Sequence, residues 1–117
     1  MSDKVRVGVV GLGYWGPNLA RNFSRVAGAE LAYCCDLDEA NLAKARGLYP
    51  NTAVTDDLDR LLGDGGLDAV VVATSVPTHY ALGKRVLEAG KHAFIEKPIA
   101  LRAADAEDLL ATAEARG

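Results

Sequence analysis

Cysteine is scarce in this chain of 117 residues, and its placement excludes two structural roles. The two cysteines, Cys34 and Cys35, are neighbours in an apolar run. Adjacent side chains on a strand point to opposite faces, so a disulfide between them is not expected. No spacing typical of a metal site surrounds them. We interpret them as two small buried side chains in a reducing compartment, and we expect no metal.

The sequence also lacks a basic stripe, a long hydrophobic run, internal repeats and a flexible linker. The net charge is −3 and the charges are dispersed, which argues against nucleic acid as a partner. The first residues, Met-Ser-Asp-Lys, carry no apolar stretch of the signal-peptide type, and no run is long enough to cross a membrane. We therefore expect a cytoplasmic protein. Residues 1–117 suffice for one domain with one core.

What the sequence does contain is organised around residues 5–16. A β-branched run predicts a buried strand, and a G-x-G-x-x-G of Gly11, Gly13 and Gly16 follows before a helical pattern. In a dinucleotide site, the first glycine allows a tight turn and the second lets a pyrophosphate approach the backbone. The third lets the helix pack close to the strand. Free N–H groups at the helix N-terminus would also face the phosphates. We interpret this segment as a phosphate-binding loop.

Three further residues belong to this loop, because Leu12, Tyr14 and Trp15 occupy its variable positions. Two interpretations of the aromatic pair stay open. Tyr14 and Trp15 either flank the cofactor or pack against neighbouring loops.

Asp36 follows the second apolar run, residues 29–35, and stands 20 residues after Gly16. At this spacing an acid meets the hydroxyls of the adenosine ribose. Asp36 could instead cap the next helix, although Asp38 is available for that role. A carboxylate at this place would repel the 2′-phosphate of NADP, and no Arg or Lys follows closely to bind that phosphate. The pattern therefore favours NAD.

The remaining chain alternates strands and helices, which predicts right-handed crossovers and a parallel sheet. We expect a Rossmann-type, doubly wound α/β fold of three layers, with strand order 3-2-1-4-5. Further strands are expected at residues 29–35, 53–55, 67–73 and 92–95. Helices are expected at residues 17–26, 39–48, 78–89 and 101–116, with a short one near 58–62 that Asp56 or Asp57 caps. The predicted inward side chains include Phe23, Val26, Leu42, Leu48, Val86, Leu109 and Leu110.

Ligands of open α/β sheets bind beside the first and fourth strands, so residues 74–79 should lie over the cofactor. Thr74 and Ser75 are expected to contact its nicotinamide half. His79 either contacts the cofactor or serves a proton relay, or it is a helix-start residue that hydrogen-bonds backbone. Glu96 and Lys97 follow the fifth strand. Lys97 could take a hydroxyl proton during hydride transfer, or it could be a solvated partner of Glu96.

Together these residues resemble the Gfo/Idh/MocA family of oxidoreductases (glucose–fructose oxidoreductase and inositol dehydrogenase). The resemblance covers essentially the whole chain and rests on Gly11–Gly16, Cys35-Asp36, Ala73-Thr74 through His79, Gly90-Lys91-His92 and Glu96-Lys97-Pro98. It implies an NAD(P)-dependent enzyme that oxidises a sugar, cyclitol or sugar-nucleotide hydroxyl. Lys97 would be the catalytic lysine, with Glu96, Lys97 and His79 beside the cofactor. Residues 13–18 look like a branch that acts on sugar nucleotides.

Two departures from the family limit what is carried over. Ser75 stands where the family often has proline, and the second domain, with the substrate pocket and the oligomerisation sheet, is absent from these residues. We therefore expect weak NAD binding without turnover, and an exposed fifth strand that invites a homodimer. Two other functions stay open: an NAD-sensing module without catalysis, and an S-adenosylmethionine-dependent methyltransferase, against which the third glycine argues.

Overall fold

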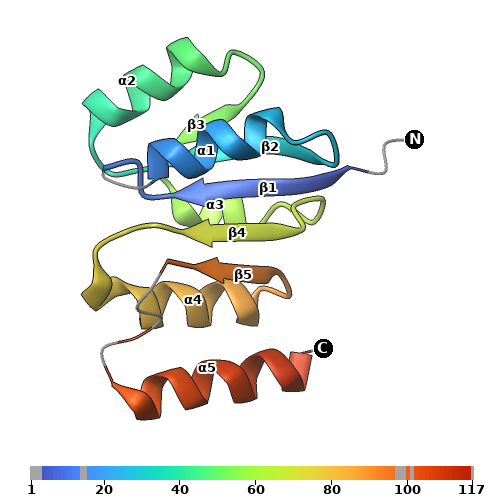
Figure 1. Ribbon diagram of the computed structural model, residues 1–117, viewed down its shortest axis with the longest axis vertical. Helices are drawn as coiled ribbons and strands as arrows, with labels where there is room; N and C mark the ends of the chain where they lie inside the picture. Colours follow the sequence, from blue (N-terminus) through green and yellow to red (C-terminus); the bar gives the residue numbers. More distant parts are fainter. Residues whose placement is uncertain (1–3, 14–15, 97–99, 101, 117) are drawn as a thin grey trace.

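The computed structural model describes residues 4–13, 16–96, 100 and 102–116. Five parallel strands form one sheet in the order β3-β2-β1-β4-β5, and their carboxyl ends share one edge (Figure 1). This order confirms the predicted Rossmann-type fold. The strands are β1 (Val5–Val10), β2 (Ala29–Cys35), β3 (Ala53–Thr55), β4 (Ala69–Val72) and β5 (His92–Ile95).

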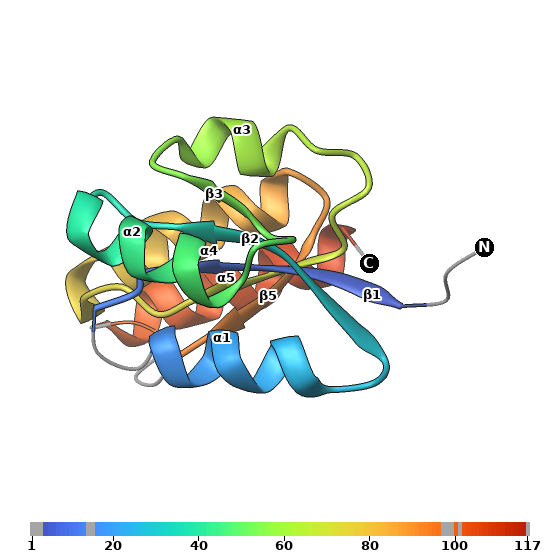
Figure 2. The ribbon, with the colours of Figure 1, turned by 90° about the horizontal axis from the view of Figure 1, so that it is seen from above.

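Helices cover both faces of the sheet and complete the three layers. They are α1 (Gly16–Arg25), α2 (Glu39–Leu48), α3 (Leu58–Leu62), the 3-10 turn η1 (Val76–Thr78), α4 (His79–Glu88) and α5 (Ala103–Arg116). Side chains of α1 and α2 share one core with β1 and β2, and side chains of α3 and α4 share the core on the opposite face. Figure 2 shows α1 and α3 on the two sides of the sheet.

Strand β2 carries one extra residue relative to β1, because Val7 pairs with Leu31 while Gly8 pairs with Tyr33. The extra residue, Ala32, therefore shares a face with Tyr33, and the alternation of side chains resumes after it. Cys34 and Cys35 then point into opposite cores, and both are free. The predicted absence of a disulfide between them is confirmed.

Helix α5 packs on α4 rather than across the sheet. The Asp108 carboxylate accepts from the Tyr80 hydroxyl and the Lys84 ammonium, each at 2.6 Å. Both contacts lower the pKa of Asp108, with the Lys84 hydrogen bond as the larger cause. Because this contact face is narrow, α5 buries Leu109 but leaves Leu110 exposed.

Three positions that were predicted to lie in the core are exposed instead, so these predictions were wrong. Leu110 is 59% exposed, Val26 is 52% exposed and Leu48 is 69% exposed. Val26 lies just beyond the end of α1, so it leaves the helical period. Leu48 is the last residue of α2, at the β3 edge of the sheet. Periodicity identified the inward faces, but it also counted as inward a residue past the end of α1, the last residue of α2 and a neighbour of the buried Leu109 within α5.

The other differences concern boundaries. Strand β4 is shorter than the predicted 67–73, because residues before it form a turn in which the Leu67 amide bonds the Asp64 carbonyl. A 3-10 turn precedes α4, and α5 begins at Ala103. None of the described helices is both long and apolar enough to cross a membrane.

Candidate functional site

The glycine loop after β1 has the geometry that each glycine predicts. Gly11 has φ +96°, and a Cβ at this residue would lie 2.7 Å from the Ala73 carbonyl oxygen. A Cβ on Gly16 would fall 1.6 Å from the Gly11 carbonyl oxygen, so α1 begins in contact with the turn. A Cβ on Gly13 would meet nothing within 4 Å. The loop is therefore closed against β4 and α1, and it leaves open space above Gly13.

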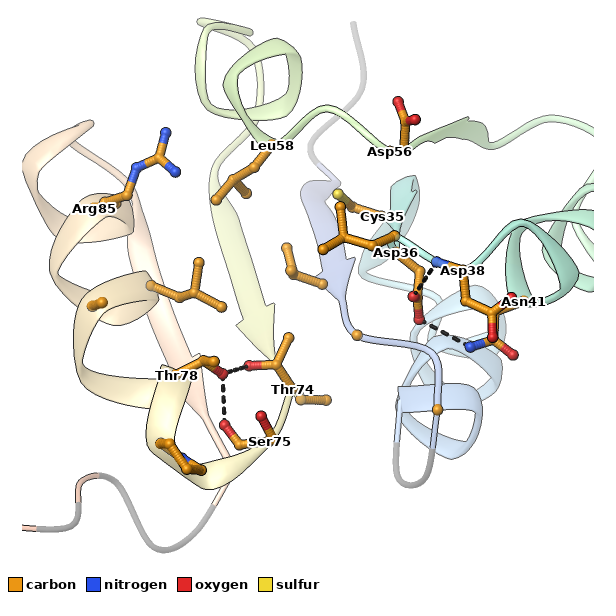
Figure 3. A pocket seen from close by; sticks show the side chains of 18 residues that line it. Cys35, Asp36, Asp38, Asn41, Asp56, Leu58, Thr74, Ser75, Thr78 and Arg85 are labelled. Atoms are coloured by element: carbon orange, nitrogen blue, oxygen red, sulfur yellow. Dashed lines mark hydrogen bonds between the residues drawn. The ribbon is translucent and has the colours of Figure 1, made fainter.

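The Asp36 carboxylate, at the end of β2, connects three segments. Its Oδ2 accepts from the Leu12 amide at 2.7 Å and from the Asn41 side-chain amide at 3.2 Å. Its Oδ1 accepts from the Asp38 amide at 2.9 Å. Asp38 caps α2 by accepting from the Ala40 amide, which confirms the predicted availability of Asp38 as the cap. The ribose role of Asp36 stays a prediction. Asp36 is thus held against the glycine loop and faces the same cleft (Figure 3).

The cleft lies at the carboxyl edge of the sheet and has a volume of about 980 Å³. That size is ample for a nucleotide. Its walls come from the ends of β1, β2 and β4, the start of α2, the β3–α3 loop and α4. Among the residues that line the cleft are Gly11, Gly13, Asp36, Leu37, Asn41, Thr74, Ser75 and Arg85.

The wall opposite Asp36 is the segment between β4 and α4. The hydroxyls of Thr74 and Thr78 are 2.5 Å apart, and the Thr78 hydroxyl donates to the Ser75 carbonyl at 2.6 Å (Figure 3). His79 is buried, and its Nε2 lies 2.9 Å from the Thr74 carbonyl oxygen. The backbone interaction that one of the two interpretations of His79 required is therefore present. Its role toward a cofactor stays a prediction.

Negative charge dominates the end of the cleft near Asp36. Burial, and after it the neighbouring carboxylates of Asp36, Asp56 and Asp57, together raise the pKa of the Cys35 thiol to about 11. Among the described residues that line the cleft, Arg85 is the one cation, and it is paired with Asp59. This end of the cleft therefore suits a neutral group with hydrogen-bond donors better than an anion.

The structure brings together only part of the predicted site. Gly11, Gly13, Asp36, Thr74 and Ser75 line the cleft. Leu12 contributes its backbone amide, Gly16 closes the turn, and Glu96 follows β5, where its amide donates to the Val72 carbonyl. The predictions for Tyr14, Trp15 and Lys97 fall outside the described residues.

Sequence reasoning missed several residues of the cleft, among them Asn41 and Leu37. Asn41 reaches Asp36 from the first turns of α2, and a polar side chain five residues after the acid was the available signal. Leu37 is 89% exposed although it is apolar, and it lines the cleft beside Asp36. An apolar residue placed directly after such an acid could have been recognised as a contact for a flat ring.

A second hollow, of about 890 Å³, runs between α1 and residues 48–52 and is lined by Arg21, Arg25 and Asn51, among others. None of the three glycines of the loop lines it, although Pro17, directly after Gly16, does. Within the part of the chain that the structure describes, no three His, Cys, Asp or Glu side chains gather as metal ligands would.

The chain matches the sequence profile of GFO_IDH_MocA, described as an oxidoreductase family with an NAD-binding Rossmann fold, over residues 5–117. It is 40% identical to inositol 2-dehydrogenase 1 of Saccharopolyspora erythraea, over 97% of this chain and 34% of that protein. Among solved structures it is similar to GenD2 from gentamicin A biosynthesis in complex with NAD, with TM-score 0.94 and 32% identity, over 100% of this chain and 33% of that one.

A second solved structure with a similar fold carries the other cofactor. Biliverdin reductase of Synechocystis in complex with biliverdin and NADP+ has TM-score 0.90 and 33% identity, over 97% of this chain and 35% of that one. The chain thus spans about a third of the length of the relatives it matches.

These matches agree with the geometry. The open space above Gly13 and the acid at the end of β2 fit a dinucleotide, and neither the methyltransferase nor the sensing module is favoured. The chain belongs to the GFO_IDH_MocA family of oxidoreductases, as its nicotinamide-dinucleotide-binding Rossmann domain.

Proposed function

We propose that this chain binds NAD+ in preference to NADP+, as the cofactor domain of a cytoplasmic dehydrogenase that oxidises a hydroxyl of a sugar, cyclitol or sugar nucleotide. The observation that carries the cofactor preference is the position of Asp36. Its carboxylate is fixed to the glycine loop through the Leu12 amide, at 2.7 Å. A ribose bound at this place would donate its hydroxyls to that carboxylate.

The same geometry opposes a 2′-phosphate. That group is strongly acidic and would have to lie beside the carboxylate of Asp36, with Asp38 two residues further on the same wall. Arg85, the one cation among the described lining residues, is already paired with Asp59. Like charges at short range and low solvent access are unfavourable, so the cleft discriminates mainly by repulsion.

We place the remaining parts of the cofactor along the cleft, from Asp36 toward the segment between β4 and α4. Backbone N–H groups of the glycine loop and of the first turn of α1 would hold the pyrophosphate over Gly13, where there is no Cβ. Thr74 and Ser75, on the opposite wall, would lie beside the nicotinamide ribose. When bound, NAD+ supplies the acceptor for a hydride from the substrate carbon. By family resemblance, the Lys97 amine would take the proton of the reacting hydroxyl.

The family's second domain would complete the enzyme. Because this chain spans about a third of its relatives, we assign the substrate pocket to the part of the protein that these residues do not contain. The free edge of β5 is where further chain, or a second copy, would pair.

Calorimetric titration with NAD+ and NADP+ tests the cofactor preference. We expect the chain to bind NAD+ at least tenfold more tightly than NADP+. In Asp36→Ser, NAD+ affinity should fall about tenfold and the two cofactors should bind within about threefold of each other. A hydrogen bond to a charged group contributes about 1.5–3 kcal/mol, and tenfold in affinity is about 1.4 kcal/mol.

Asp56→Ser is the matched control, because it removes the same charge from another wall of the cleft. It should change the ratio of the two affinities by less than about threefold. Serine at residue 36 retains an acceptor for the Leu12 amide, and thermal unfolding verifies that the variant is folded. Equal affinity for both cofactors in the unmodified chain, or tighter binding of NADP+, would contradict the proposal.

A further inference from the structure

The segment between β4 and α4, which forms one wall of the cleft, is held by a hydrogen bond from a buried side chain. We propose that His79 is a positioning residue that holds the Thr74 carbonyl and thereby sets the wall for the nicotinamide half of the cofactor. The proposal rests on the proposed function and deepens it, because it assigns the two halves of the dinucleotide to separate supports.

The first observation is where His79 lies. It is the first residue of α4 and is 1% exposed, and it does not line the cleft. Its Nε2 is 2.9 Å from the Thr74 carbonyl oxygen. A carbonyl oxygen only accepts hydrogen bonds, so Nε2 carries the hydrogen in this pair. His79 therefore acts on the cleft through Thr74 and not by touching a ligand.

The second observation is that the peptide bond between Ala73 and Thr74, on the amino side of Thr74, lies against the glycine loop. A Cβ on Gly11 would lie 2.7 Å from the Ala73 carbonyl carbon and 2.8 Å from the Thr74 nitrogen. The two loops that face each other across the cleft thus meet at this peptide. A shift of Thr74 would change the spacing between Gly11 and the opposite wall.

The third observation is that hydroxyl groups fix the outer side of the same segment. Thr78 bonds the Thr74 hydroxyl and the Ser75 carbonyl. Both hydroxyl-bearing residues are solvent-accessible, whereas the donor to the Thr74 carbonyl is the buried imidazole of His79. An unpaired buried carbonyl is more costly than an exposed one, so His79 contributes the stronger constraint on this wall.

The adenosine side has its own support. Asp36 is held by Leu12, Asp38 and Asn41, and none of these contacts passes through His79 or Thr74. A ligand that fills only the adenosine side should therefore be insensitive to His79. ADP is such a ligand, whereas NAD+ fills both sides.

The experiment measures the affinities of ADP and NAD+ for the unmodified chain, His79→Leu and His79→Gln by calorimetry. His79→Leu places an apolar side chain of similar size at this buried residue and removes the hydrogen-bond donor. We expect it to weaken NAD+ about tenfold and ADP less than twofold. Glutamine places an amide donor near the position of Nε2, so His79→Gln should restore NAD+ affinity to within about threefold of the unmodified chain.

Two results would overturn the proposal: equal weakening of both ligands by His79→Leu, which is a general structural effect, or no weakening of NAD+. Failure of the proposed dinucleotide binding has a different signature, since the unmodified chain would then bind neither ADP nor NAD+. If His79→Leu does not fold, long-range 1H–15N correlation of the unmodified chain carries the test. A hydrogen on Nε2 of His79 is expected, and an Nε2 without one would overturn the assignment.

Discussion

A methyl group at Gly16 should cost this chain its fold, whereas the same methyl group at Gly13 should cost it only its ligand. The Cβ of Gly16→Ala would lie 1.6 Å from the Gly11 carbonyl oxygen. The backbone fixes the positions of both atoms, so they cannot separate without opening the turn. We expect a loss of more than about 3 kcal/mol in the free energy of unfolding, a large share of the stability of a domain this size.

The Cβ of Gly13→Ala would meet nothing within 4 Å. The free energy of unfolding, measured with urea, should therefore change by less than about 1 kcal/mol. The methyl group would occupy the space proposed for the pyrophosphate, so NAD+ affinity should fall at least tenfold.

Gly47→Ala is the control for both glycine variants. A Cβ at Gly47, in α2, also meets nothing within 4 Å, and the residue is far along the chain from the loop. Alanine in a helix should leave NAD+ affinity unchanged and raise stability by about 0.5–1 kcal/mol. An unfolding curve of Gly16→Ala that matches the unmodified chain, or undiminished NAD+ binding by Gly13→Ala, would contradict the loop geometry.

Removing the buried ammonium of Lys91 should lower stability without affecting the cofactor. Lys91 is 7% exposed, and its Nζ donates to the Asp64 carbonyl at 2.7 Å and to the Leu67 carbonyl at 3.0 Å. These bonds close the loop between α3 and β4, at the edge of the sheet opposite the cleft. Lys91→Met should therefore lower the free energy of unfolding by about 2–3 kcal/mol, because two carbonyls lose a charged donor.

Lys44→Met is the matched control for this substitution. Lys44 is exposed on α2, so its replacement should change the stability by less than about 0.5 kcal/mol. NAD+ affinity of the folded protein should stay within twofold for both variants. A loss of NAD+ affinity in Lys91→Met at unchanged stability would place Lys91 in the binding site and contradict this account.

The fold was largely predictable because its signals are local. The β-branched runs and the turns between them specify the strands, and the glycine loop specifies which strand is first at the cleft. The same locality explains the errors. Leu109 and Leu110 are identical neighbours on α5, but Leu109 is buried and Leu110 is exposed. Which of the two is buried depends on how α5 packs on α4, and the local pattern does not contain that information.

The candidate site was less predictable because it depends on contacts between distant residues. A carboxylate at residue 36 was expected to meet a ribose, but its bonds to Leu12 and Asn41 need the folded geometry. For His79, sequence position left a cofactor contact and a backbone bond equally open, and packing against Thr74 supplies the second. Lys91 stands in the Gly90-Lys91-His92 segment of the family resemblance, and its burial beneath the loop between α3 and β4 cannot be inferred from that segment.

The cleft between Asp36 and Thr74 is the dinucleotide site that we propose. Titration of the 15N-labelled chain with NAD+, followed by 1H–15N NMR, locates the bound dinucleotide. We expect the largest shift changes at the amides of Leu12, Gly13, Leu37 and Thr74. Shift changes that leave these amides unmoved and gather instead around Arg21, Arg25 and Asn51, in the second hollow, would contradict it.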